Sequence, residues 1–99
     1  MIIELYKSTQ PNKKYTVKVN DKTIHFGDSR YKDFRTFADD RYKRKENYIK
    51  RHQVNENWNK DGIETAGFWS RWLLWNKPTL EQSIKDVEKR FKISIKNKT

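Results

Sequence analysis

The stretch Gly67-Phe68-Trp69-Ser70-Arg71-Trp72-Leu73-Leu74-Trp75 decides the fold of this chain. It holds three of the four tryptophans, and no other segment of the sequence is so apolar. In a helix its apolar side chains would point nearly all round, and only Ser70 and Arg71 offer a polar side. A helix of this kind is normally buried. We therefore expect this Trp segment (residues 67–75) to form the core, ended by Asn76-Lys77-Pro78.

The residues that follow predict a second helix that packs on the Trp segment. Thr79-Leu80-Glu81-Gln82 has the form of a capping box, which opens a helix over about residues 80–91. The apolar residues of this helix recur every three or four positions and share one side: Leu80, Ile84, Val87 and Phe91. Beyond it, Ile93 and Ile95 alternate with polar residues, which fits a short final strand beside the N-terminal one.

The N-terminal residues predict an antiparallel sheet. Residues 2–8 have the composition of a strand, and residues 14–19 alternate between apolar and polar side chains. Asn20-Asp21 has the chemistry of a tight turn, and residues 23–26 return as the next strand of a hairpin. Three lysines give this hairpin a basic edge or face: Lys14, Lys18 and Lys22. They either contact an anionic partner or only keep the sheet soluble and unpaired.

A loop and a basic helix are expected next. Residues 28–37 mix polar and aromatic side chains without a period, as in a loop anchored by its rings. Thr36 has the character of an N-cap, with Asp39 in the first turn, so the helix is expected over residues 38–52. An apolar stripe at spacings of three and four would turn this helix to the core: Ala38, Tyr42 and Ile49.

A second stripe on the same helix is the best candidate anion-binding surface. Its residues follow at steps of three, four and three: Arg41, Arg44, Tyr48 and Arg51, flanked by Lys45. Arginine forms paired hydrogen bonds with a phosphate, and a tyrosine among arginines either stacks on a base or packs against their stems. The alternative is an exposed helix face with a half-buried Tyr48. In the loop that follows, Trp58 either pins the loop to the core or stacks on a base.

The totals fit one α+β domain. Ninety-nine residues suit a single domain spanning residues 1–99. Only 33% of the residues are hydrophobic and 36% are charged, so aliphatic side chains alone would make a thin core. Four Trp, five Tyr and five Phe compensate, because a buried aromatic removes roughly 150–250 Å² from water. We expect an N-terminal antiparallel sheet of three or more strands, packed on C-terminal helices around a Trp-rich core.

The charge balance points to an anionic partner. A net charge of +10 and a pI near 9.9 favour nucleic acid, either DNA or RNA, or an acidic protein surface. A solvated surface that keeps a small domain soluble is the plainer alternative. The absence of cysteine excludes disulfides, thiolate chemistry and Cys-based zinc sites. A short, polar N-terminus and the lack of a long apolar run predict a soluble intracellular protein with no membrane partner.

Catalytic chemistry has little support in this sequence. Its two histidines, His25 and His52, match no nuclease spacing, although a nuclease could use them if folding brought them together with a carboxylate. The glycines form no phosphate-cradling loop, and no residue pattern calls for a metal or another cofactor. We therefore expect a non-enzymatic protein without cofactors, and a nuclease remains a third hypothesis.

Three blocks of sequence together carry a resemblance. They are residues 15–19 through 24–27, residues 44–52 with 55–58, and residues 65–80 with 83–84. The combination resembles a family of small basic proteins of unknown function encoded by large and giant double-stranded DNA viruses, over roughly residues 14–87. The resemblance implies a viral protein of the host cytoplasm or the virion that is not secreted, and it transfers no catalytic residue to this chain.

Our first functional hypothesis is a non-enzymatic nucleic-acid-binding protein, with packaging beside a viral genome as one setting for it. Its expected contacts are the basic helix face and the hairpin lysines: Arg41, Arg44, Lys45, Tyr48, Arg51, Lys14, Lys18 and Lys22. The alternative is a small structural or adaptor protein of a virion, which would bind other proteins through the same charges or through an exposed tryptophan. Buried tryptophans and a continuous basic face would favour nucleic acid. The sequence leaves the oligomeric state open.

Overall fold

Three strands open the chain and form the antiparallel sheet that the sequence predicts. In the computed structural model, which describes residues 1–99, they are β1 (Ile2–Lys7), β2 (Lys13–Val19) and β3 (Lys22–Asp28). β2 pairs with both neighbours in antiparallel register. Asn20 and Asp21 join β2 to β3 with positive φ angles of 49° and 65°, as in the tight turns that follow the twist of paired strands. The predicted hairpin is confirmed.

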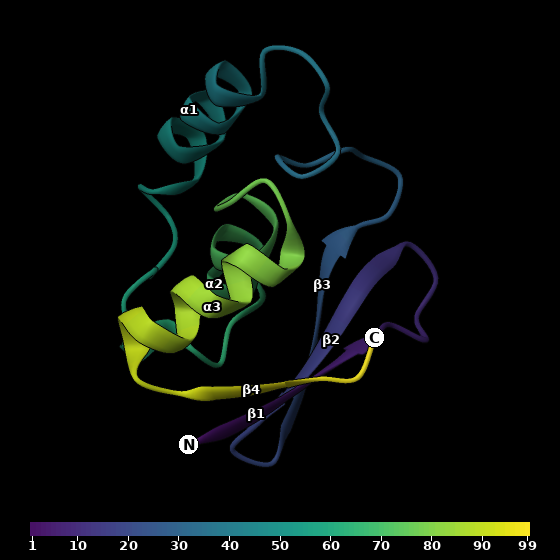
Figure 1. The fold of residues 1–99 in the computed structure, drawn as a ribbon, viewed down its shortest axis with the longest axis vertical. Coiled ribbons are helices and arrows are strands. Elements are labelled where there is room, and N and C mark those ends of the chain that lie inside the picture. The colour runs from purple at the N-terminus through teal and green to yellow at the C-terminus, as the bar shows by residue number, and fades with distance from the viewer.

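The last residues of the chain add a fourth strand on the other side of β1. β4 (Ser94–Asn97) runs parallel to β1, with Ile95 opposite Ile3, and the strand order is β3-β2-β1-β4. Figure 1 shows β1 and β4 side by side. The predicted final strand is confirmed, and it makes the complete sheet mixed, with an antiparallel N-terminal part.

The Trp segment forms the centre of the core, as predicted. α2 (Ala66–Trp69) continues into a π-helical turn, η2 (Ser70–Leu74), in which a backbone amide donates to the carbonyl oxygen five residues earlier. The Trp69 side chain is fully buried, and its indole N–H donates to the carbonyl oxygen of Ile63 at 2.7 Å. The polar N–H group of this fully buried ring therefore has a hydrogen-bond partner.

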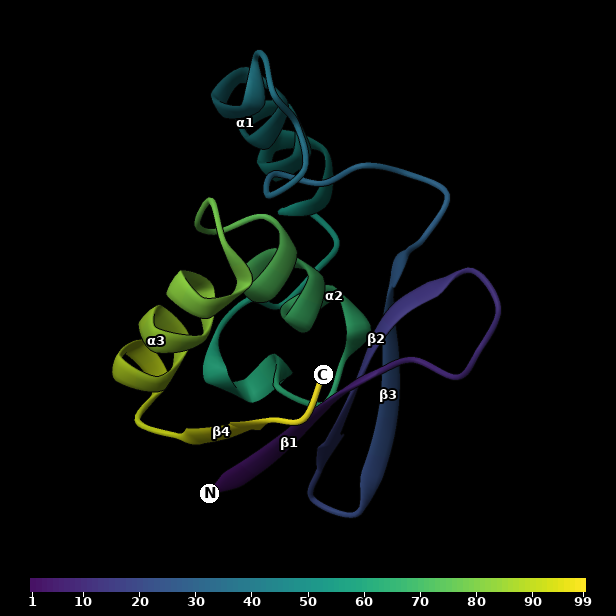
Figure 2. The same ribbon diagram turned by 45° about the vertical axis from the view of Figure 1, so that its right-hand side comes forward.

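Helix α3 (Leu80–Phe91) covers the side of the Trp segment that faces away from the sheet. It begins after the predicted cap, Thr79, whose hydroxyl accepts a hydrogen bond from a first-turn amide at 3.2 Å. The Phe91 ring lies 5.0 Å from the ring of Phe68 and 5.4 Å from that of Trp72, so the predicted stripe packs where expected. Figures 1 and 2 show α2 between the sheet and α3. The predicted α+β fold with a Trp-rich core is confirmed.

The basic helix, α1 (Arg41–His52), begins three residues later than predicted. The predicted N-cap is wrong, because the Thr36 hydroxyl accepts from the Asp33 amide at 2.9 Å and donates to the Asp33 carbonyl oxygen at 3.1 Å. Asp40, directly before the helix, adopts a φ of 56°, and its side chain caps no amide. Thr36 thus closes a turn around Asp33, and the left-handed backbone of Asp40 stops the helix from extending further back.

The inward side of α1 also differs from the predicted apolar stripe. Ala38 lies before the helix and is exposed, and the Tyr42 side chain is 70% exposed. Tyr48 is buried instead, with its ring 4.4 Å from that of Trp75 and only 5° from parallel to it. The reason is that α1 packs on the Trp75 side of the Trp segment, where the Tyr48 ring stacks face to face on the Trp75 ring. α1 stands at one end of the molecule, away from the sheet (Figures 1 and 2).

Trp58 anchors the loop between α1 and α2 to the core, which was one of the two interpretations of this residue. Its ring is half-buried and lies 6.1 Å from the Tyr48 ring, nearly parallel to it. The Trp72 indole N–H donates to the Trp58 carbonyl oxygen at 2.9 Å. Trp58 therefore supports the buried side of α1.

The same loop contains a short 3-10 turn, η1 (Lys60–Gly62), and is folded too tightly for a side chain at its last residue. A Cβ on Gly62 would lie 2.0 Å from the carbonyl oxygen of Asn57, so Gly62→Ala must displace backbone. We expect the variant to lose about 1–3 kcal/mol of unfolding free energy in urea denaturation. Gly67→Ala is the control, because its Cβ would meet the movable end of the Glu56 side chain. Equal losses from the two variants would contradict this account.

Candidate functional site

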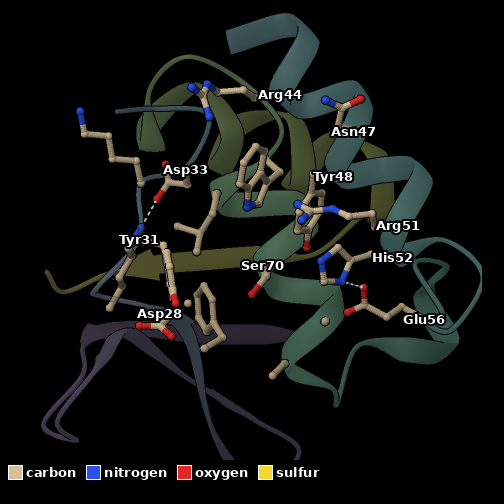
Figure 3. Close-up of a pocket in the computed structure, with 18 of the residues that line it drawn as sticks. Asp28, Tyr31, Asp33, Arg44, Asn47, Tyr48, Arg51, His52, Glu56 and Ser70 are labelled. Carbon is tan, nitrogen blue, oxygen red and sulfur yellow. Dashed lines mark hydrogen bonds and ion pairs between the residues drawn. The ribbon is translucent and has the colours of Figure 1, made fainter. Parts of the chain in front are cut away.

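A cleft of about 1170 Å³ separates α1 from the end of the β2–β3 hairpin and the loop that follows it. α1 forms one wall, which is lined by Arg44, Asn47, Tyr48, Lys50, Arg51 and His52. The opposite wall consists of Lys13, Lys14 and residues between 27 and 33. The floor includes Phe26, Ser70, Leu74 and Trp75. Figure 3 shows the two walls facing each other across this basic cleft, as we name it.

The end of β3 lies close to the floor because Gly27 has no side chain. Its φ is +78°, and a Cβ there would lie 2.7 Å from Cδ1 of Leu74. A residue with a side chain would be strained by the backbone angle and by this contact. The glycine therefore brings the wall that begins at residue 27 directly onto the Trp segment.

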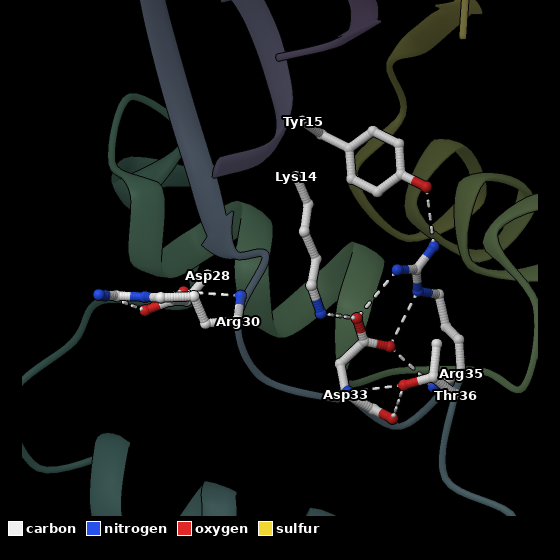
Figure 4. Close-up of polar contacts among 7 residues, drawn as sticks. All are labelled: Lys14, Tyr15, Asp28, Arg30, Asp33, Arg35 and Thr36. Atoms are coloured by element: carbon white, nitrogen blue, oxygen red, sulfur yellow. Dashed lines mark hydrogen bonds and ion pairs between the residues drawn. The ribbon is translucent and has the colours of Figure 1, made fainter. Parts of the chain in front are cut away.

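Asp33 ties this wall to the hairpin through a buried ion-pair network (Figure 4). Its carboxylate accepts from Lys14 Nζ at 2.6 Å and from two nitrogens of the Arg35 guanidinium at 2.9 Å each. Arg35 also donates to the hydroxyl of Tyr15 at 2.9 Å. Burial alone would raise the pKa of Asp33, but the hydrogen bonds from Arg35 and Lys14 outweigh it and hold the pKa below its usual value. The single negative charge of Asp33 is shared by Lys14 and Arg35, so this network keeps a net charge of about +1.

A second aspartate on this wall, Asp28, also pairs with an arginine, but this pair is exposed to solvent. The Asp28 carboxylate accepts from the Arg30 guanidinium at 3.0 and 2.8 Å and from the Arg30 amide at 2.9 Å. These hydrogen bonds lower the pKa of Asp28 to about 2. Asp28 and Asp33 thus each hold the arginine two residues later in the chain, one exposed and one buried.

The third acid of the cleft, Glu56, faces a histidine of α1. Oε2 of Glu56 lies 2.8 Å from Nδ1 of His52. The Glu56 carboxylate also packs against α2 at Gly67, which has no side chain. A Cβ on Gly67 would lie 2.0 Å from Oε1 of Glu56. Asp28 and Asp33 therefore each have a cationic partner, whereas Glu56 faces an imidazole, which is charged only when it is protonated.

The remaining cations of the cleft are not neutralised. Four exposed side chains line it without any carboxylate partner: Lys13, Lys32, Arg44 and Arg51. A fifth, Lys50, has only a solvent-exposed pair with Glu46 at 3.1 Å, one helical turn away, which contributes little. The Arg44 guanidinium lies 4.3 Å from the centroid of the Phe37 ring. The two walls therefore present uncompensated positive charge to each other.

The structure divides the predicted anion-binding face of α1. Arg44 and Arg51 are exposed and line the cleft. Arg41 instead donates to the carbonyl oxygen of Phe37 at 3.2 and 2.9 Å. Lys45 donates to the carbonyl oxygen of Asn76 at 2.8 Å, and burial lowers its pKa. Both of these side chains fasten α1 to neighbouring loops.

Tyr48, the remaining member of that face, is 5% exposed. Its ring stacks on the rings of Trp75 and His52 at 4.4 and 4.3 Å, and burial raises the pKa of its hydroxyl. Tyr48 is therefore placed to support the wall and floor of the cleft, and its ring is already occupied by aromatic neighbours.

The three hairpin lysines do not form one surface with α1. Lys14 lies in the buried network of Asp33, with its side chain 15% exposed. Lys18 lies 5.3 Å from the centroid of the Tyr6 ring, and Lys22 pairs with Glu64 at 3.0 Å. Lys18 and Lys22 do not line the basic cleft.

Sequence reasoning missed the wall after β3. It contributes Lys32 and the exposed Tyr31, while Lys13 precedes the predicted start of its strand. The run Arg30-Tyr31-Lys32, two cations around an aromatic residue, was the available signal. It lies in a segment without a period, so the sequence alone does not say which way these side chains turn.

The two histidines that a nuclease would need together have separate partners. His25 lies in β3, with its Nδ1 3.0 Å from the hydroxyl of Ser8 and 2.6 Å from that of Thr16. His52 lies on α1, beside Glu56. No group of three or more His, Asp or Glu side chains has the clustering that a metal ion requires.

Together, the fold and the site define a small α+β protein with a cationic cleft. The chain belongs to a family of unknown function, DUF5754, whose model matches residues 3–52. The matched residues run from β1 to the end of α1, so they include both walls of the basic cleft but not Trp75 in its floor. No curated protein and no solved structure matches this chain. The predicted membership of an uncharacterised family is confirmed.

Proposed function

We propose that this protein binds nucleic acid without an enzymatic step, and that the basic cleft is the contact surface. One observation carries the proposal. Four exposed cations without carboxylate partners line the two walls, while two of the three acids of the cleft, Asp28 and Asp33, are held by arginines. A surface of this kind is suited to a polymer with regularly spaced negative charges, such as a phosphodiester backbone.

The basic residues of the cleft favour phosphate groups, rather than a single carboxylate, as the ligand. Arg44 and Arg51 carry planar guanidinium groups, which bind phosphate oxygens through two hydrogen bonds at once. Lys13 and Lys32 add charge from the opposite wall. The net charge of +10 would in addition attract a polyanion over a long range at low salt.

The alternative, a structural or adaptor protein, has less support. It would bind an acidic protein through the same charges or use an exposed tryptophan of the Trp segment. The second route lacks support, since Trp69 is fully buried, Trp72 is 9% exposed and Trp75 is half-buried. The exposed large hydrophobic residues are few: Met1, Ile2, Tyr31, Tyr42 and Val54. None of the helices has both the length and the apolar character to cross a bilayer.

The proposal includes a viral setting, in the host cytoplasm or in the virion beside the genome. Its support is the resemblance of three sequence blocks to small basic proteins of large double-stranded DNA viruses. A non-enzymatic cationic protein suits such a role because packaged genomes need charge neutralisation. Mass spectrometry of purified virions tests this part: the protein should copurify with genome-containing particles and be absent from empty ones.

The binding itself is tested by its salt dependence. Four phosphate contacts predict that the association constant for an oligonucleotide falls roughly 50- to 150-fold between about 50 and 200 mM salt. Fluorescence anisotropy with a labelled oligonucleotide measures this directly. Failure to bind any DNA or RNA at about 50 mM salt, or an affinity that does not depend on salt, would contradict the proposal.

A further inference from the structure

We propose that the basic cleft takes a single strand of nucleic acid, with its bases held by Tyr31 and Trp75 and its phosphates held by the cations of the two walls. This inference rests on the proposed function and adds the class of nucleic acid to it. It starts from the aromatic side chains that line the cleft among the cations.

Tyr31 is the exposed aromatic residue of the cleft. Its side chain is 70% exposed, although a large ring normally gains from burial. It lies on the wall opposite α1 and carries a cation on either side in the sequence, Arg30 and Lys32. Figure 3 shows Tyr31 across the cleft from Tyr48 and Arg51. A nucleic-acid strand that enters the cleft would therefore meet the Tyr31 ring next to the cations that bind its phosphates.

Trp75 provides a second ring, deeper in the cleft and rigidly supported. It is half-buried and lines the floor. The Tyr48 ring stacks on it at 4.4 Å, and the Phe37 ring lies 6.1 Å away. A ring fixed in this way loses little conformational freedom when a base contacts it, which is the general advantage of preorganisation.

Uncharged polar side chains also line the cleft. Ser70 in the floor and Asn47 on the α1 wall line the cleft (Figure 3). A hydroxyl and an amide can donate to and accept from the edge of a base. The cleft therefore offers cations to phosphates, rings to base faces and polar groups to base edges.

This combination favours a single strand over a duplex. In a duplex the bases stack on each other, and only their edges and the backbone are accessible. Proteins that bind single strands instead combine a positive groove with aromatic side chains on which bases stack. The volume of about 1170 Å³ also exceeds the roughly 300–1,000 Å³ of a small-molecule site, which leaves room for more than one nucleotide.

The test compares three polyanions: a short unstructured single strand, the duplex formed with its complement, and inorganic polyphosphate, which has no bases. Anisotropy at one low salt concentration should show the single strand binding at least about tenfold more tightly than the duplex. Tyr31→Ala should weaken single-strand binding by about tenfold and leave polyphosphate binding unchanged. Tyr31→Phe should retain the affinity, because it keeps the ring.

Tyr42→Ala is the matched control, because Tyr42 is also 70% exposed but does not line the cleft. It should leave single-strand binding unchanged. Equal or tighter duplex binding, or equal effects of the two alanine variants, would overturn the single-strand inference while leaving nucleic-acid binding in place. Binding to polyphosphate but to neither nucleic acid would overturn the inference and the proposed function together.

Discussion

Asp33→Asn is expected to lower the free energy of unfolding by about 3–5 kcal/mol, the cost of leaving buried charges without their partner. The Asp33 side chain is 2% exposed, and those of Lys14 and Arg35 are 15% and 14% exposed. An asparagine would keep the shape but remove the only anion that these two cations share. Chemical denaturation measures the loss, with circular dichroism to confirm that the variant still folds.

Asp28→Asn is the matched control for this change. Asp28 also holds the arginine two residues later, but in solvent, where the Arg30 side chain is 65% exposed. Water and salt screen such a pair, so the loss should be much smaller. Similar losses from the two variants would show that the burial of Asp33 does not matter, and would contradict the expected result.

The same network predicts the direction of the acid response. The pKa of Asp33 is lower in the folded protein than in the unfolded chain, where an aspartate titrates near about 3.9. The unfolded state therefore binds more protons between these two values, and stability falls as the pH falls. The contribution of Asp33 is complete above about pH 4 and is lost as the pH drops through the lowered pKa. Asp33→Asn should show a weaker loss of stability below about pH 4 than the wild type.

The elements that the sequence predicted well are those whose signals are local. Asn20-Asp21 between alternating strands and Thr79 before an apolar stripe each determine their element from nearby residues. The start of α1 was missed because the Thr36 hydroxyl has two possible uses, as a helix cap or in a turn around Asp33. The choice depends on Asp33 being held by Lys14, far away in the sequence.

The candidate site shows the same limit. Arg44 and Arg51 could be found because their spacing puts them on one helix face. The same spacing included Tyr48, which turns inward because Trp75 presents a flat ring to it. Helical periodicity says which residues share a face, but not which edge of that face meets a neighbour. Tyr31 could not be assigned at all, since no period applies to its loop.

The double variant Arg44→Gln, Arg51→Gln is expected to lower the affinity for an oligonucleotide roughly 30-fold at low salt, at about 1 kcal/mol for each lost contact. Both side chains are exposed and line the basic cleft. They are two helical turns apart, about 10 Å along the axis, so each would hold a different phosphate. Removing two contacts should reduce the slope of log K against log salt by about 1.4 for a single strand.

The control for this variant must change the net charge equally without touching the cleft. Lys85→Gln with Lys89→Gln does so, because both lysines are exposed on α3 and neither lines the cleft. Long-range attraction alone would make the two double variants equivalent, since each lowers the net charge by two. Direct phosphate contacts would instead confine the loss of affinity and the flatter salt dependence to the arginine variant. Equal effects would therefore reject the basic cleft as the contact surface, even if the protein binds nucleic acid.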